Sequence, residues 1–140
     1  MSGLDRAILA EKASAIERHL ARVADRLPDH PEQFQPSTDA SDAVILHLWQ
    51  AVQATIDLAL GACLLLHLGT PNSYAEAFER LAQGGYLDPG LAERLTLAAG
   101  FRNLVAHMYD RIDMTRVYRA AQQGPADLRA FLARLRDLIP

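Results

Sequence analysis

Four side chains able to take part in catalysis lie within eight residues of one another: Arg102, Asn103, His107 and Tyr109. On an α-helix, Asn103 and His107 are one turn apart and share a face. Arg102 and Tyr109 are seven residues apart, so their directions differ by only about 20°. If this segment is helical, a cation, an amide, an imidazole and a phenol line one broad polar strip.

This strip suits phosphodiester chemistry. Arg102 is able to hold a phosphate through two hydrogen bonds and to offset the negative charge of its transition state. Because an unperturbed imidazole titrates near neutral pH, His107 can move protons as a general base or acid, while Asn103 either orients His107 or donates to a phosphate oxygen. The competing interpretation is an exposed helix whose arginine and histidine merely stabilise the C-terminal end of the helix dipole.

The same residues resemble the signature of a known family. Arg102, the polar residue Asn103, three further residues and His107 match the HEPN-superfamily motif, and the extension to Tyr109 fits the narrower HepT-like pattern. The surrounding sequence also resembles this family, over the stretches 51–59, 73–78, 100–107 and 109–113. The resemblance extends over the chain from Asp5 to Leu138.

Resemblance to HepT-like proteins implies an all-α fold, an antiparallel HEPN-type bundle of four main helices plus short helices. It implies one domain over residues 1–140 and a homodimer whose two signature strips meet at a cleft. It also implies a metal-independent endoribonuclease that needs no cofactor, with RNA as its substrate and Arg102, Asn103 and His107 as its catalytic residues. Such proteins are typically toxins, and an MntA-type nucleotidyltransferase antitoxin silences them by attaching AMP to the motif tyrosine, here Tyr109.

Three further residues are candidates for supporting this site: Asp57, Asp110 and Arg111. Asp57 lies within an apolar segment, where an unpaired carboxylate is costly to bury. We expect it either to pair with Arg102 or another arginine, or to lie on an exposed polar stripe. Arg111 is followed by Arg116 and Arg119, which either extend a phosphate-binding track or form a solvated face.

The composition restricts the function classes. A chain of 140 residues that is 50% hydrophobic and 22% charged is typical of one globular domain. The lone cysteine, Cys63, can form neither an internal disulfide nor a multi-cysteine zinc site. His47 and His67 lie too far apart along one helix to bind a single metal ion within one chain, so we expect no metal site.

The charge is unevenly distributed along the chain. The net charge of −3 argues against a strongly basic nucleic-acid-binding protein. However, residues 1–101 hold 7 basic and 13 acidic side chains, whereas residues 102–140 hold 7 basic and 4 acidic ones. The C-terminal part therefore has a net charge of +3, beginning at the first residue of the signature.

Helices are expected throughout, because Ala, Leu, Arg and Glu dominate and no segment alternates like a strand. The expected helices span residues 5–26, 42–68, 73–83, 88–109 and 113–123, with a last one from Pro125 to Leu138. Prolines in 28–41 indicate a linker, Ser73 and Glu76 form a capping-box pattern, and Gly124-Pro125 is expected to break the chain.

The segment 42–68 is apolar around nearly its whole circumference. Such a helix must be buried on several sides, and a small bundle buries it only in part, so we expect a homodimer through this helix. Its longest unbroken apolar run, Leu58 to Leu66, is shorter than the roughly 20 residues of a membrane span. With no signal-like N-terminus, we expect a soluble cytoplasmic protein.

Two other functions are compatible with this sequence. One is a non-catalytic HEPN module that binds its nucleotidyltransferase or a nucleotide, and the other is a purely structural helical dimer. The intact strip of Arg102, Asn103, His107 and Tyr109 favours the nuclease.

Overall fold

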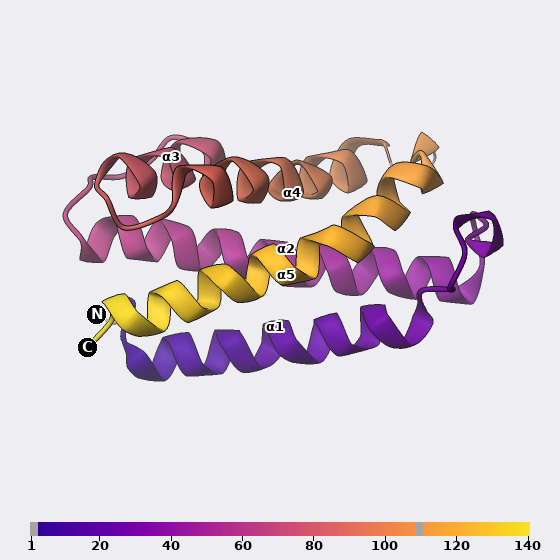
Figure 1. The fold of residues 1–140 in the computed structure, drawn as a ribbon, viewed down its shortest axis with the longest axis horizontal. Helices are drawn as coiled ribbons and strands as arrows, with labels where there is room; N and C mark the ends of the chain where they lie inside the picture. Colours follow the sequence, from indigo (N-terminus) through magenta and orange to yellow (C-terminus); the bar gives the residue numbers. More distant parts are fainter. Residues whose placement is uncertain (1–2, 109–110) are drawn as a thin grey trace.

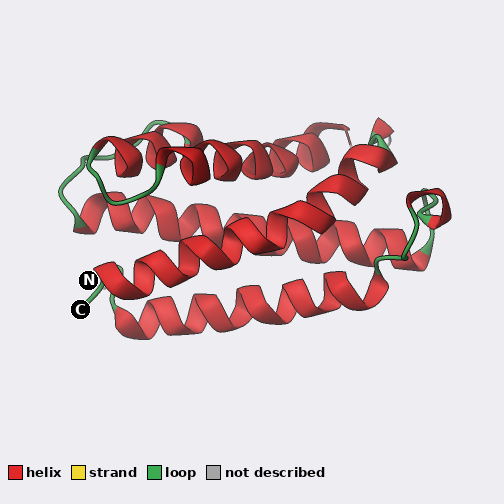
Figure 2. Cartoon of the chain, viewed as in Figure 1, coloured by secondary structure: helices red, strands yellow, loops and turns green. Residues whose placement is uncertain are grey.

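The computed structural model describes residues 3–108 and 111–140, except for the side chains of 106–108. Over these residues the chain is helical and has no β-strand (Figure 2). The elements are α1 (Arg6–Arg26), the short 3-10 helix η1 (Pro31–Gln33), α2 (Asp39–Leu65), α3 (Tyr74–Gln83), α4 (Pro89–Met108) and α5 (Met114–Leu138). The all-α class expected from the sequence is confirmed.

The helix α2 occupies the centre of the bundle. It lies between α1 on one side and α3 and α4 on the other, and α5 crosses in front of it from α1 toward α4 (Figure 1). Because α2 packs against all four other α-helices, most of its circumference is buried within one chain. Leu46 and Leu64 remain 54% and 57% exposed, so an unpartnered apolar surface is left at both ends of α2.

The composition of α2 also meets a hydropathy criterion for a membrane span. The helix Asp39–Leu65 is long and apolar enough to cross a bilayer by length and composition, which the count of unbroken apolar residues did not reveal. Half of its most apolar window is buried inside the protein, and the core helix of a soluble protein meets the same criterion. The cytoplasmic location stays a prediction from the sequence.

The start of α2 corrects the expected boundary. The hydroxyl oxygen of Thr38 accepts a hydrogen bond from the backbone N–H of Ser41, and the Ser41 hydroxyl oxygen accepts one from the backbone N–H of Thr38. This reciprocal capping box makes Thr38 the N-cap, so α2 begins at Asp39 rather than at residue 42. It also ends at Leu65 rather than 68, because His67 takes a left-handed backbone conformation with φ of 59°.

The expected break at Gly124-Pro125 was wrong, since α5 continues through Pro125 as one helix. The residue before a proline is normally driven out of the helical region by a clash with its Cβ, and Gly124 has none. The buried residues on both sides of the proline remain in helical phase: Tyr118, Ala121, Leu128, Leu132 and Leu135. One continuous apolar face thus packs on the core, which outweighs the local break signal.

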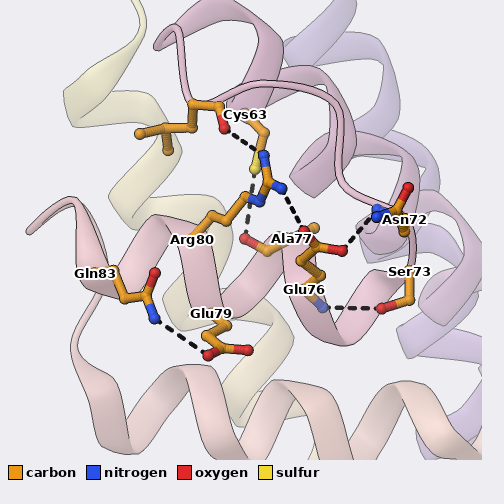
Figure 3. A network of polar contacts seen from close by, with 9 residues as sticks. Cys63, Asn72, Ser73, Glu76, Ala77, Glu79, Arg80 and Gln83 are labelled. Atoms are coloured by element: carbon orange, nitrogen blue, oxygen red, sulfur yellow. Dashed lines mark hydrogen bonds and ion pairs between the residues drawn. The ribbon is translucent and has the colours of Figure 1, made fainter.

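The N-terminus of α3 is held by a polar network (Figure 3). Ser73 caps the helix by accepting from the backbone N–H of Glu76 at 3.1 Å, as expected. The Glu76 carboxylate, however, accepts from the backbone N–H of Asn72 rather than from that of Ser73, and it also pairs with Arg80. Arg80 donates in addition to the backbone oxygen of Leu68 at 2.7 Å, so this network ties the α2–α3 connection to α3.

Two histidines meet between α1 and α2. The Nδ1 atoms of His19 and His47 lie 3.0 Å apart. One ring must donate and the other accept, so at least one imidazole is neutral in this contact. Burial, then the charges of His47 and Arg18, lower the pKa of His19 below its ordinary value of 6.5.

We expect this pair to make the stability of the bundle depend on pH. A histidine with a lowered pKa in the folded state stabilises the fold fully above pH 6.5, and this contribution is lost as the pH falls through the lower folded pKa. The melting temperature should therefore decrease as the pH falls below 6.5. In His19→Gln the decrease should be shallower, while in the exposed control His30→Gln it should match the wild type. Equal pH profiles for all three proteins would contradict this role.

Candidate functional site

The helix α4 carries the signature. Its first residue is Pro89, and the preceding residue Asp88 caps it, because the Asp88 carboxylate accepts from the backbone N–H of Leu91 at 2.9 Å. This is the start expected from the sequence. The backbone remains helical through Met108, so positions 102, 103 and 107 lie on one continuous helix. The side chain of His107, and Tyr109 and Asp110 altogether, lie outside the described residues.

The guanidinium of Arg102 is held by two amide oxygens. Its Nε donates to Oε1 of Gln53 on α2 at 2.6 Å, and its Nη1 donates to Oδ1 of Asn103 at 3.2 Å. Both acceptors are neutral, and Arg102 has no ion pair with any residue of the described chain. Its side chain is thus oriented, and no carboxylate among the described residues offsets the positive charge with which it can attract an anion.

Asp57 joins this arrangement through Gln53. The Gln53 amide donates from Nε2 to Oδ1 of Asp57 at 3.1 Å while its own oxygen accepts from Arg102. The other carboxylate oxygen of Asp57 lies 3.9 Å from Nζ of Lys12 on α1. The carboxylate, with its side chain 43% exposed, therefore lies on an exposed polar stripe and pairs with a lysine instead of an arginine. Of the two alternatives for Asp57, the exposed stripe is correct, and its link to Arg102 is indirect.

Asn103 is fixed at both ends of its side chain. Its Oδ1 accepts from Arg102, and its Nδ2 donates to the hydroxyl oxygen of Tyr74 at 3.2 Å. Tyr74 is the first residue of α3, so the polar network around Ser73 and Glu76 positions the partner of Asn103. The described residues thus form one chain of hydrogen bonds across three helices: Asp57, Gln53, Arg102, Asn103 and Tyr74.

Sequence reasoning missed the positioning roles of Gln53 and Tyr74. Their partners lie 49 and 29 residues away along the chain, and no local spacing indicates such contacts. The only available signal was that Gln53 precedes Asp57 by one helical turn on an otherwise apolar helix.

Within the described residues, the other predicted candidates take no part in this chain of hydrogen bonds. Arg111, Arg116 and Arg119 are exposed. Cys63 is fully buried, as expected for a small core residue, and burial raises the pKa of its thiol. Within the described part of the chain, no group of three or more potential metal ligands is found.

Comparison with known proteins gives concordant results. The model of the family described as ribonuclease HepT-like matches residues 16–135 of the chain. The chain is 29% identical over 125 residues to a protein of Shewanella oneidensis named mRNA nuclease HepT, over 89% of this chain and 93% of that protein.

Solved structures resemble the fold closely. A tri-AMPylated HEPN toxin of Shewanella oneidensis, solved in complex with an MNT antitoxin, is 28% identical with a TM-score of 0.84. The similarity covers 93% of this chain and 97% of that one. A toxin–antitoxin crystal structure with AMP-PNP contains a chain that is 26% identical with a TM-score of 0.86, covering 94% of this chain and 99% of that one.

Proposed function

This chain belongs to the ribonuclease HepT-like family, and from that premise we propose that it is a metal-independent endoribonuclease toxin that cleaves RNA through Arg102, Asn103 and His107. Membership confirms the resemblance drawn from the signature and the ribonuclease class expected from it. The observation that carries the proposal is the guanidinium of Arg102, which two neutral amide oxygens orient while no carboxylate of the described chain neutralises it. We infer that residues 1–140 act as one HepT-like domain.

The proposed reaction is a transesterification within the RNA. His107 accepts the proton of a 2′-hydroxyl, whose oxygen then forms a bond to the adjacent phosphorus. The bond from phosphorus to the 5′-oxygen breaks, and that oxygen takes up a proton from a general acid. The products are a 2′,3′-cyclic phosphate and a 5′-hydroxyl, and Arg102 offsets the charge that develops on the non-bridging oxygens.

A homodimer would supply the second proton-transfer group. The signature of each chain contains a single histidine, His107, and cleavage needs both a base and an acid. We therefore propose that His107 of the partner subunit acts as the general acid. Two exposed leucines support α2 as the interface. Leu46 lies about two helical turns before Gln53, and Leu64 lies about two turns after Asp57, so both leucines lie on the side of α2 that carries these polar residues. Two copies joined there would bury both leucines and bring the two copies of Arg102 toward each other.

We propose that an MntA-type nucleotidyltransferase is the antitoxin and that it adenylylates Tyr109. The support is the similarity to an AMPylated HEPN toxin that was solved with its MNT antitoxin. Asp110 and Arg111, which follow Tyr109 directly, stay candidates for supporting the catalytic site. The alternative is a non-catalytic binding module, which binds the nucleotidyltransferase or a nucleotide and does not cut RNA.

RNA cleavage by the purified chain in the presence of a metal chelator tests the nuclease proposal. We expect the wild type to cut single-stranded RNA and leave cyclic phosphate ends, and His107→Ala to be inactive because proton transfer contributes about 10²–10⁴-fold in rate. His30→Ala, which removes an exposed histidine from the α1–α2 connection, serves as the control and should keep full activity. Full activity of His107→Ala would exclude the mechanism, and an inactive wild type would favour the binding module.

A further inference from the structure

A groove between α4 and α5 lies beside the signature and is not used by the proposed chemistry. Its volume is about 560 Å³, within the usual range of roughly 300–1,000 Å³ for ligand sites. Three arginines and one aspartate are the charged residues that line it: Arg94, Arg116, Arg119 and Asp127. The groove is therefore electropositive in a chain whose net charge is negative.

The positive charge is concentrated at one end of the groove. Arg94 on α4 pairs with Asp127 on α5, with 3.0 Å between Nε and Oδ1, so these two charges offset each other. Arg116 and Arg119 are exposed and pair with no acidic residue of the described chain. They lie three residues apart on α5 and thus project from one face, which gives two adjacent guanidinium groups with no ion pair among the described residues.

The antiparallel course of the two helices brings this end close to the signature. Arg94 near the start of α4 pairs with Asp127 in the second half of α5, and the two helices converge toward the end of α4 and the start of α5 (Figure 1). Arg116 and Arg119 in the first turns of α5 therefore lie toward the part of α4 that carries Arg102. Tyr74 also lines the groove, while its hydroxyl oxygen accepts from Asn103, so groove and signature share a wall.

Small residues keep the groove open. Gly100 on α4 and Gly124 on α5 both line it. A Cβ atom at Gly124 would meet nothing within 4 Å, and one at Gly100 would approach only the Tyr74 hydroxyl at 3.9 Å. The space beside both glycines is thus free for a ligand.

We propose that this groove binds the sugar–phosphate backbone of the RNA strand next to the cleavage site, with Arg116 and Arg119 as phosphate ligands. The inference rests on the proposed function and extends it to a second contact surface. Guanidinium groups match phosphate oxygens through paired hydrogen bonds, and contacts to the backbone position a strand without reading its sequence. The partly buried ring of Tyr74 offers a surface on which a base can stack.

Binding of a fluorescent single-stranded RNA oligonucleotide, measured by anisotropy with both sets of substitutions made in the His107→Ala chain, tests the groove. We expect the double variant Arg116→Gln with Arg119→Gln to bind roughly tenfold more weakly or worse. The slope of log affinity against log salt should also fall by about 1.4, the value for two lost contacts to a single strand. The matched control is Arg129→Gln with Arg136→Gln, which removes the same charge from the same helix outside the groove.

A second substitution, at Gly100, tests whether RNA binding needs the open space of the groove as well as its positive charge. Gly100→Leu fills the space beside Tyr74 without changing any charge, whereas Gly100→Ala adds only a methyl group in ordinary contact. We expect the leucine to weaken RNA binding and the alanine to leave it unchanged. Equal losses in the Arg116/Arg119 and Arg129/Arg136 double variants, or full RNA affinity in Gly100→Leu, would overturn the inference.

Two further binding measurements, with AMP and with the nucleotidyltransferase, test whether the groove binds another ligand instead of RNA. If the arginine substitutions weaken binding of AMP as much as binding of RNA, the groove is a mononucleotide site and the inference is wrong. It is also wrong if they abolish complex formation with the nucleotidyltransferase but leave RNA affinity intact. If the wild type cleaves RNA but the Arg116/Arg119 double variant keeps full RNA affinity, the inference about the groove is rejected and the nuclease proposal stands. Groove-dependent binding without cleavage by the wild type would reject the nuclease proposal instead.

Discussion

Arg102→Ala is expected to lower the rate constant for RNA cleavage by on the order of 10³-fold while leaving the fold intact. Removal of a group that stabilises developing charge in a transition state typically costs about 10²–10³-fold, and a catalytic arginine on a phosphoryl group contributes about 10³–10⁵-fold. Arg102 is only half-buried, so its truncation leaves no large cavity. Single-turnover cleavage of a labelled RNA measures the rate, and thermal unfolding verifies that the variant is folded.

The contact between Arg102 and Gln53 gives this prediction a second readout. Gln53→Ala removes an acceptor that orients the guanidinium, so we expect a smaller loss, about tenfold, as for the removal of roughly 1.4 kcal/mol of transition-state stabilisation. Because Gln53 acts through Arg102, its substitution should have no further effect in the Arg102→Ala chain.

Gln50→Ala, one turn earlier on the exposed part of α2, is the matched control and should be fully active. Additive losses in the double variant of Gln53 and Arg102 would contradict a positioning role for Gln53. Full activity of Arg102→Ala would exclude it as the phosphate ligand.

Local chemistry made most helix boundaries predictable. The caps at Asp5, Ser73, Asp88 and Asp113 all accept backbone N–H groups as their residue types indicate, because a cap depends on atoms within three residues. The error at Gly124-Pro125 has the opposite origin. A local break signal there competes with apolar residues far along α5 that stay in phase on one core, and the sum of their burial is the larger effect.

The candidate site divides in the same way. The placement of Arg102 and Asn103 on one helix follows from helical periodicity, so the sequence was sufficient for it. Their partners Gln53 and Tyr74 come from α2 and α3, and only tertiary packing brings those helices to α4. The charge of Asp57 signalled a polar site, yet its ionic partner is Lys12 on α1, a choice that periodicity within α2 does not determine.

Adenylylation of Tyr109 is expected to abolish RNA cleavage and toxicity altogether. Tyr109 directly follows Met108, the last residue of α4, and is two residues from His107. An AMP group there adds bulk and a phosphate charge, which repels the RNA backbone and competes with it for arginines. Co-expression with the cognate nucleotidyltransferase should therefore add the mass of one or more AMP units to the peptide that contains Tyr109, and RNA cleavage should disappear in parallel.

The variant Tyr109→Phe separates the switch from the chemistry. Because the phenol hydroxyl takes no part in the proposed proton transfers, this variant should cleave RNA like the wild type, yet remain active and toxic when the nucleotidyltransferase is present. Tyr86→Phe, which removes a hydroxyl from the turn between α3 and α4, is the control and should still be silenced. If Tyr109→Phe is modified and silenced like the wild type, another residue accepts the AMP. If it is inactive even without the nucleotidyltransferase, the hydroxyl takes part in cleavage itself, and the silencing of the wild type would then act by removing a catalytic group.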